Sequence, residues 1–267
     1  LKVINNNVVN DQGPLVKAFH YAVDNGADII NISLVGDSDQ DIRDAVKYAY
    51  DRGVAVIAAS GNTRVGLDQT PLDPVCADAG LGEEWVLGVS AIGEAHTLAP
   101  FSNTGFSCID LTAPGINIAS TIRYAPRYGL TERYRGGWQG TSFAAPFVSA
   151  TAALIKSVQP TWGPKEIYDA ILSNVHRTPP LDVAAYEMVY GAGLLQTDKA
   201  VAYAKAQRAL APALAGVLSA DLGTGNTQEW SVERTSPVER QLQALTNVHD
   251  AAGYDSGYVT FRQVNGA

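Results

Sequence analysis

The sequence predicts an α/β fold, a doubly wound and mostly parallel sheet with helices on both faces. Two observations carry this prediction. Stretches with one apolar helical face alternate along the chain with short segments rich in β-branched residues. One such segment, residues 54–59, is an almost continuous apolar run, which is typical of parallel strands buried on both faces.

The first 60 residues contain two helix–strand units. After a short strand-like run at residues 1–4, the apolar residues of segment 15–23 recur at i, i+3, i+4, i+7 and i+8, which places them on one face of a helix. Gly26 ends this helix, and residues 28–34 follow as a β-branched strand. The plan repeats with a helix face at residues 42–49 and the apolar strand described above.

Regular elements continue to about residue 206. Residues 63–84 predict a loop, because they contain prolines and several glycines. The elements expected elsewhere are strands at 85–92 and 116–118 and helices at 142–156, from Pro164 and from Thr197. The pattern then weakens, so residues 206–267 are expected to form an extension or the start of a further domain.

The composition excludes two classes of partner. The chain has 27 acidic and 19 basic residues, and its net charge of -8 has the wrong sign for a phosphate-binding surface. No run approaches the roughly 18 to 20 apolar residues of a membrane helix. The longest candidate, residues 143–155, is interrupted by Pro146, Ser149 and Thr151. We therefore expect neither a nucleic-acid partner nor a membrane span.

Two cysteines, Cys76 and Cys108, are too few for a disulfide scaffold and fit no zinc-binding pattern. One disulfide between them and a pair of small buried apolar side chains are both consistent with the sequence. The separation of two residues along the chain does not give their distance in space.

Three segments carry residues suited to catalysis. They are Asn-Ile-Ser-Leu at 31–34, Ala-Ala-Ser-Gly-Asn at 58–62 and Gly-Thr-Ser-Phe-Ala-Ala-Pro at 140–146. In this order they resemble the subtilase family of serine proteases, and residues 101–105 are similar to a further family segment. The resemblance extends over about residues 1–205. It implies that this region is the C-terminal part of a subtilisin-like catalytic domain that lacks its N-terminal strands.

Ser142 is the nucleophile that the resemblance implies. A serine in the first turn of a helix lies among unpaired N–H groups at the positive end of the helix dipole, where developing negative charge is stabilised. Gly140 allows a sharp turn and a close approach of substrate, and Thr141 can cap the helix. Ala144 and Ala145 permit tight packing beneath the serine. An ordinary helix-capping serine is the alternative interpretation of these residues alone.

Asn62 follows a buried strand, at the edge where α/β sheets place their ligands. By resemblance, its side-chain amide is an oxyanion-hole donor that works with the backbone N–H of Ser142. The alternative for an isolated Gly-Asn pair is a simple turn.

The segment at Ser33 and Leu34 resembles the family's substrate-binding strand, whose backbone pairs with an extended peptide. Val35 stands where the family usually has glycine. A branched side chain there is expected to narrow the mouth of the pocket, so the resemblance implies peptide binding but no side-chain preference. The opposite wall is expected to comprise Ala59, Ser60 and Gly61.

The base and its orienting carboxylate are missing from the motifs of this chain. In the family both lie upstream of the segments above, and the histidine stands in a His-Gly-Thr context. The four histidines here precede other residues: His20, His96, His176 and His249. The aspartates Asp24, Asp28 and Asp110 occupy positions that the family does not use for catalysis. No base and no orienting acid are assigned.

The sequence therefore predicts that the intact parent is a serine endopeptidase with a Ser-His-Asp triad, of which this chain carries Ser142 and the oxyanion donor Asn62. Alone, the chain is expected to be unstable and inactive. The rival hypothesis is a catalytically silent subtilase-like module that holds peptides at Ser33 and Leu34. An esterase is disfavoured, because residues 140–144 do not match a Gly-x-Ser-x-Gly elbow.

The expected partners are a polypeptide substrate and the missing N-terminal part of the same domain. The chemistry requires no cofactor, and the residues specify no metal ligands, although structural calcium is common in the family. Family habit and a disulfide would place the protein outside the cytoplasm. The start at Leu1 suggests a fragment of a precursor or one part of a nicked protein.

Overall fold

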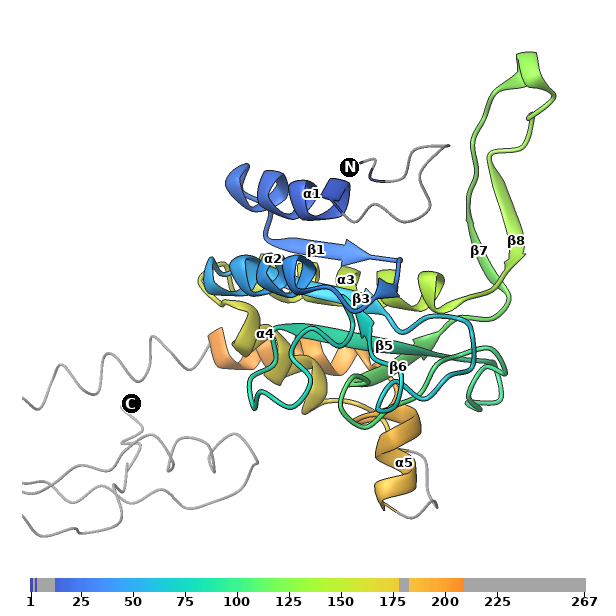
Figure 1. The fold of residues 1–267 in the computed structure, drawn as a ribbon. Coiled ribbons are helices and arrows are strands. Elements are labelled where there is room, and N and C mark those ends of the chain that lie inside the picture. Colours follow the sequence, from blue (N-terminus) through green and yellow to red (C-terminus); the bar gives the residue numbers. More distant parts are fainter. Residues whose placement is uncertain (2, 4–12, 178–182, 209–267) are drawn as a thin grey trace, which may run out of the picture. The chain divides into compact units, whose positions relative to one another are not determined.

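The centre of the fold is a four-stranded parallel sheet in the order β1-β3-β5-β6 (Figure 1). The computed structural model describes residues 1, 3, 13–177 and 183–208. The strands are β1 (Ile29–Ile32), β3 (Ala55–Ala59), β5 (Val86–Ile92) and β6 (Leu111–Pro114). All three pairings among them are parallel, which confirms the predicted α/β class.

Helices cover both faces of this sheet, and β3 shows why its sequence is apolar throughout. The side chains of Val56 and Ala58 pack in one core cluster with α1 (Gly13–Asp24) and α2 (Gln40–Asp51). Those of Ala55, Ile57 and Ala59 pack in a second cluster with α3 (Thr141–Val158), α4 (Pro164–Leu172) and the helix at residues 197–208. Alternate residues therefore meet different helical layers, as a parallel strand buried on both faces requires.

Two small antiparallel pairs and one helix complete the described elements. β2 (Gly36–Asp37) pairs with β4 (Leu72–Asp73). β7 (Ile118–Thr121) pairs with β8 (Tyr134–Trp138), and the 3₁₀ turn η1 (Pro126–Tyr128) lies between them. α5 (Val183–Tyr190) precedes the last helix. The sequence analysis missed β2, β4, β6, β8 and α5. The extension at residues 206–267 lies almost wholly outside the described residues.

Helix α3 is longer and more apolar than the sequence analysis expected. It has 18 residues and a mean hydropathy of 1.2, and among the described helices it alone is long and apolar enough to cross a membrane. Its side chains at Ala144, Val148 and Ile155 nevertheless belong to the buried core cluster that includes the central strands. Packing against the sheet therefore explains the apolar face that these three residues form.

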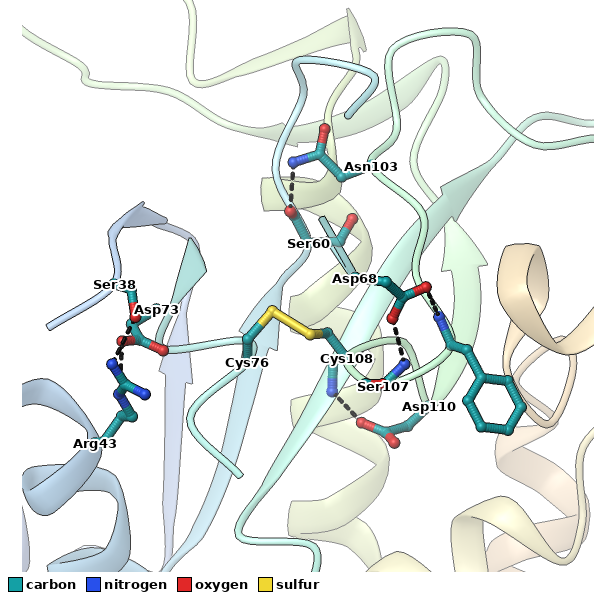
Figure 2. Close-up of a disulfide and its surroundings, with 12 residues drawn as sticks. Ser38, Arg43, Ser60, Asp68, Asp73, Cys76, Asn103, Ser107, Cys108 and Asp110 are labelled. Atoms are coloured by element: carbon teal, nitrogen blue, oxygen red, sulfur yellow. Dashed lines mark hydrogen bonds and ion pairs between the residues drawn. A yellow bond between two sulfur atoms is a disulfide. The ribbon is translucent and has the colours of Figure 1, made fainter. Parts of the chain in front are cut away.

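Cys76 and Cys108 form a disulfide, with their Cα atoms 4.8 Å apart (Figure 2). It joins the loop after β4 to the loop before β6. Asp68 holds the same region, because its carboxylate accepts hydrogen bonds from the backbone N–H groups of Phe106 at 2.9 Å and Ser107 at 3.0 Å (Figure 2). The structure thus decides between the two interpretations that the sequence left open.

An acidic cavity of about 470 Å³ lies at the amino ends of β5 and β6, at the sheet edge opposite the candidate catalytic segments. Burial raises the pKa of Asp110 well above its usual value of 3.8, and the nearby carboxylates of Glu84 and Asp78 add to the effect. Burial also raises the pKa of Glu84 and of Asp78. Oδ2 of Asp110 accepts a hydrogen bond from the backbone N–H of Gly88 at 2.6 Å.

Replacement of Asp110 by asparagine is expected to increase the free energy of unfolding at pH 7, because an amide oxygen can still accept from Gly88 but no charge is buried. The folded state of the native protein binds the Asp110 proton more tightly than the unfolded chain does. Its stability therefore falls as pH rises from about 3.8 through the raised pKa. Denaturant unfolding at a series of pH values tests this, with the exposed rim variant Asp169→Asn as control. Equal destabilisation by Asp110→Asn at every pH would contradict it.

Candidate active site

The three segments singled out in the sequence meet at the carboxyl edge of the central sheet. Ser33 follows the end of β1, and Asn62 lies three residues after the end of β3. The turn before α3 reaches the same edge, where Gly140 N–H donates to the carbonyl of Gly115 at 2.9 Å. Hydrogen bonds from Ser33 to Ser142 and from Thr141 to Asn62 join the segments directly.

Ser142 lies in the first turn of α3 and is half-buried. Its Oγ donates to the carbonyl oxygen of Ser33 at 3.2 Å, and its own carbonyl oxygen accepts from the Ser33 hydroxyl at 2.9 Å. Pro146 explains why the carbonyl oxygen of Ser142 is free to accept the hydrogen bond from Ser33. Proline has no N–H to donate to the carbonyl four residues earlier, which is that of Ser142, so this oxygen takes a partner from outside the helix.

Gly140 is required by the turn that precedes Ser142. Its φ of 142° is one that residues with a side chain rarely adopt. A Cβ atom there would also lie 3.3 Å from Nδ2 of Asn62. A side chain at this position would therefore both strain the backbone and crowd the amide of Asn62.

Thr141 does not cap helix α3, contrary to the expectation from sequence. The N-cap residue is Gly140, which has no side chain to offer, and Thr141 is the first residue of the helix. The Thr141 hydroxyl instead donates to Oδ1 of Asn62 at 3.0 Å and accepts from the backbone N–H of Gly61 at 3.0 Å. Thr141 thus fastens the end of β3 to the start of α3.

The oxygen of the Asn62 amide is fully engaged, and this fixes the direction of its NH₂ group. Oδ1 accepts from both the backbone N–H and the hydroxyl of Thr141, at 2.9 and 3.0 Å. No group of the described residues accepts from Nδ2. In the same turn Phe143 N–H donates to Gly140, whereas Ser142 N–H has no acceptor among the described residues. Two donors without an acceptor among the described residues, Nδ2 of Asn62 and N–H of Ser142, therefore lie at the turn that begins α3.

Asn103 supports the loop that carries Asn62, and the sequence analysis assigned it no role. It is fully buried, and its Nδ2 donates to the carbonyl of Ser60 at 2.9 Å (Figure 2). Its Oδ1 accepts from the backbone N–H groups of Thr63 and Val65 at 3.0 and 3.1 Å. The available signal was the family-like segment at residues 101–105, but only the folded structure reveals what Asn103 holds.

The two expected walls of the substrate groove approach each other at Val35 and Gly61. Gly61 has a φ of 99°, and a Cβ atom there would lie 3.1 Å from a methyl group of Val35. Ala59 and Ser60 are buried, so this wall would present backbone rather than side chains to a peptide. A narrowed mouth of the groove and peptide binding both remain predictions.

No histidine or carboxylate of the described residues contacts the Ser142 hydroxyl. The ring of His20 packs edge-on against Tyr48, and that of His96 lies 6.4 Å from the ring of His176. His249 lies outside the described residues. Three or more side chains that could share a metal ion do not come together anywhere in the described ranges. Within these ranges the site contains a serine hydroxyl and two N–H donors without an acceptor, and no base contacts the hydroxyl.

Apolar surface surrounds the free side of β1. Within the described residues β1 pairs with β3 alone, and a cavity of about 370 Å³ lies between β1 and α1, lined in part by Leu15 and Phe19. On α3 the side chains of Phe147 and Leu154 are 42% and 49% exposed. The predicted strand at residues 1–4 includes residues 2 and 4, which lie outside the described residues.

A serine hydroxyl at a helix N-terminus, beside an amide donor at the carboxyl edge of a parallel sheet, is typical of hydrolases that use a serine nucleophile. Comparison with known proteins identifies the family to which the chain belongs within this class. A model of the subtilase family of peptidases matches residues 6–232. The chain belongs to the subtilase family. The match runs past residue 205, into residues that the structure does not describe.

Relatives and solved structures agree with this assignment. The chain is 36% identical over 173 residues to the major intracellular serine protease of Bacillus subtilis (strain 168), a match that covers 64% of this chain and 50% of that protein. It is 30% identical over 202 residues to subtilisin DY of Bacillus licheniformis, which covers 75% of this chain and 66% of that protein. The structure of the prenylagaramide maturation protease PagA aligns with a TM-score of 0.61 and 26% identity, over 76% of this chain and 71% of that one.

The chain spans only part of the curated relatives that it matches. It covers 50% of the major intracellular serine protease and 30% of the minor extracellular protease Epr, which is 34% identical over 216 residues and also comes from Bacillus subtilis (strain 168). That match takes in 79% of this chain. By name, these relatives include both an intracellular and an extracellular protein.

Proposed function

We propose that residues 1–205 are the C-terminal part of the catalytic domain of a serine endopeptidase that hydrolyses peptide bonds through a Ser-His-Asp triad. Ser142 is the nucleophile, and Asn62 is a donor of the oxyanion hole. The observation that carries this proposal is the pair of unused donors in the first turn of α3. Thr141 occupies the oxygen of Asn62, so Nδ2 of Asn62 and N–H of Ser142 are both available to an anion.

The chemistry follows from this arrangement. The Ser142 hydroxyl leaves the carbonyl of Ser33, gives its proton to a base and attacks the carbonyl carbon of the scissile bond. The negative charge that develops on the carbonyl oxygen is stabilised by the two donors and by the positive end of α3. The amide nitrogen then leaves with a proton returned by the base, and water hydrolyses the acyl-serine. An extended substrate lies along Ser33, Leu34 and Val35, opposite residues 59–61.

We further propose that the base and the orienting carboxylate belong to polypeptide that covers the free side of β1. The cavity beside Leu15 and Phe19 and the exposed Phe147 and Leu154 of α3 support this proposal, because apolar surface of this kind is stabilised when another segment packs on it. The parent protein, meaning the longer polypeptide that supplies this part, is the active species. Residues 206–267 are its C-terminal extension or a further domain.

An extracytoplasmic location is also part of the proposal. The disulfide between Cys76 and Cys108 supports it, because disulfides persist in oxidising compartments and are rare in the cytosol of most organisms.

A fluorophosphonate probe tests the function directly, since it labels only an activated serine. We expect Ser142 to be labelled in the parent protein and hardly at all in the isolated chain of 267 residues. Peptide mapping of the labelled protein by mass spectrometry identifies the modified residue. Robust labelling of the isolated chain would refute the dependence on a second part. Absence of labelling in a folded parent that still binds peptides would instead favour the catalytically silent module.

A further inference from the structure

The two-stranded ribbon at residues 118–138, here called the arm, projects away from the central sheet (Figure 1). Backbone hydrogen bonds continue between its two sides as far as the tip. The N–H of Ile122 donates to the carbonyl oxygen of Arg133 at 2.9 Å, and that of Ala125 donates to the carbonyl oxygen of Leu130 at 2.9 Å. It buries little of its own surface. The side chains of Tyr128 and Tyr134 are 70% and 72% exposed. The arm is therefore an ordered projection rather than a part of the core.

The arm is basic in a chain that is acidic as a whole. It contains four arginines and one glutamate, a net charge of +3, whereas the whole chain has a net charge of -8. The four arginines are Arg123, Arg127, Arg133 and Arg135. Only Arg135 forms an ion pair among the described residues, with Glu132 at 3.3 Å. The other three arginines have no anionic partner in the ranges that the structure describes.

Tyrosine rings orient two of these arginines. The guanidinium of Arg133 lies 4.3 Å from the ring centre of Tyr124, and that of Arg123 lies 5.7 Å from the ring centre of Tyr128. A guanidinium that packs against a ring keeps its N–H donors free at its edge, where they can bind both oxygens of a carboxylate. The exposed edge of the arm is therefore arranged to receive carboxylates.

The arm leads directly into the candidate active site. Its last residue, Trp138, stacks on Phe143 with ring centres 5.7 Å apart, and Phe143 follows Ser142 in the chain. Arg135 precedes Ser142 by only seven residues. A polypeptide whose carbonyl group lies at Ser142 is thus well placed to run along the arm.

We propose that the arm binds an acidic segment of the polypeptide substrate and so directs cleavage to peptide bonds close to clusters of aspartate and glutamate. This proposal rests on the proposed function of Ser142. Charge complementarity and the continuity of the arm with the site favour a substrate peptide over nucleic acid or an anionic membrane. Three unpaired arginines on one narrow ribbon do not make the broad basic surface that the latter partners require.

The test compares peptides that share one cleavable sequence and differ in a neighbouring block of glutamate, glutamine or lysine. In the parent protein, kcat/KM is expected to be about tenfold higher for the glutamate peptide than for the glutamine peptide at low salt, the size expected of a few exposed ion pairs. Salt at about 0.5 M is expected to remove the difference. The variant Arg123→Glu/Arg127→Glu/Arg133→Glu should reverse the preference toward the lysine peptide. Because a misfolded protein cannot gain a new preference, reversal also shows that the variant folds.

The matched control is Arg52→Glu, which changes an arginine that also packs on a tyrosine, Tyr48, but lies outside the arm. It should keep the native order of preference. Binding of the same peptides to the Ser142→Ala parent, followed by fluorescence anisotropy, separates the two proposals. Arm-dependent binding to the Ser142→Ala parent, together with no cleavage by the native parent, would support the arm and contradict the peptidase. Equal cleavage of the three peptides would overturn the proposal for the arm and leave the peptidase proposal standing. The arm proposal would also be overturned if the triple variant lost only the binding of anionic vesicles or DNA.

Discussion

Replacement of Ser142 by alanine in the parent protein is expected to lower kcat for a peptide substrate by about a million-fold, the loss established for the nucleophile of subtilisin. The hydroxyl that forms the acyl intermediate would be gone, while the oxyanion donors and the peptide-binding strand would remain. We therefore expect KM to change little. Steady-state kinetics with a fluorogenic peptide measures both constants, and active-site titration measures the fraction of competent protein.

Ser149 supplies the control for Ser142. It lies on the same helix, and its hydroxyl bonds to the side chain of Asn31 at 2.7 Å and to the carbonyl of Ala145 at 3.1 Å. The Ser149→Ala variant is expected to retain kcat within a few-fold. Comparable activity in the Ser142→Ala and native proteins would exclude Ser142 as the nucleophile.

Replacement of Asn62 by alanine is expected to lower kcat by about 100- to 1,000-fold with little change in KM, the loss established for the corresponding donor of subtilisin. The donor stabilises charge that exists only in the transition state, so the substrate in its ground state does not depend on it. The variant Asn62→Asp sharpens the test. It keeps the oxygen that accepts from Thr141 but has no NH₂ group, so a loss at least as large as that of Asn62→Ala is expected.

Asn25 provides a comparison, because its exposed amide donates to the carbonyl of Tyr21 far from any segment of the site. The Asn25→Ala variant should leave both kinetic constants unchanged. A drop in kcat/KM of the Asn62 variants that came entirely from a higher KM would contradict the oxyanion role and indicate a ground-state contact.

The sequence predicted three of the four strands of the buried central sheet and little of the exposed part of the fold. The missed central strand is β6, whose proline and following glycine favour a turn in the sequence. Strand β3 was evident because both of its faces are buried, which leaves an unbroken apolar run from Val54 to Ala59. The arm was missed beyond its first residues. Its strands bury little, so no packing requirement imposes a hydrophobic period on residues 119–138.

The sequence predicted which segments form the candidate site, but it did not predict the hydrogen bonds that join them. The motifs identified Ser142 and Asn62, but the expectation that Thr141 caps the helix was wrong. A threonine before an apolar helix is a common N-cap, and only the folded structure brings Asn62 close enough to engage it. The role of Asn103 could not be predicted for the same reason, because its hydrogen-bond partners lie 38 to 43 residues away in the chain.

The disulfide also bears on the survival of a protein exposed to proteolysis. Asn62 precedes Cys76 in the chain, and Ser142 follows Cys108. Within the intervening loop, residues 79–84 are exposed and offer a natural point for backbone cleavage. A cut there would separate Asn62 from Ser142, the two proposed oxyanion donors, but the Cys76–Cys108 bond would keep both pieces in one covalent molecule. The bond thus lets a nicked site remain assembled for as long as the surroundings stay oxidising.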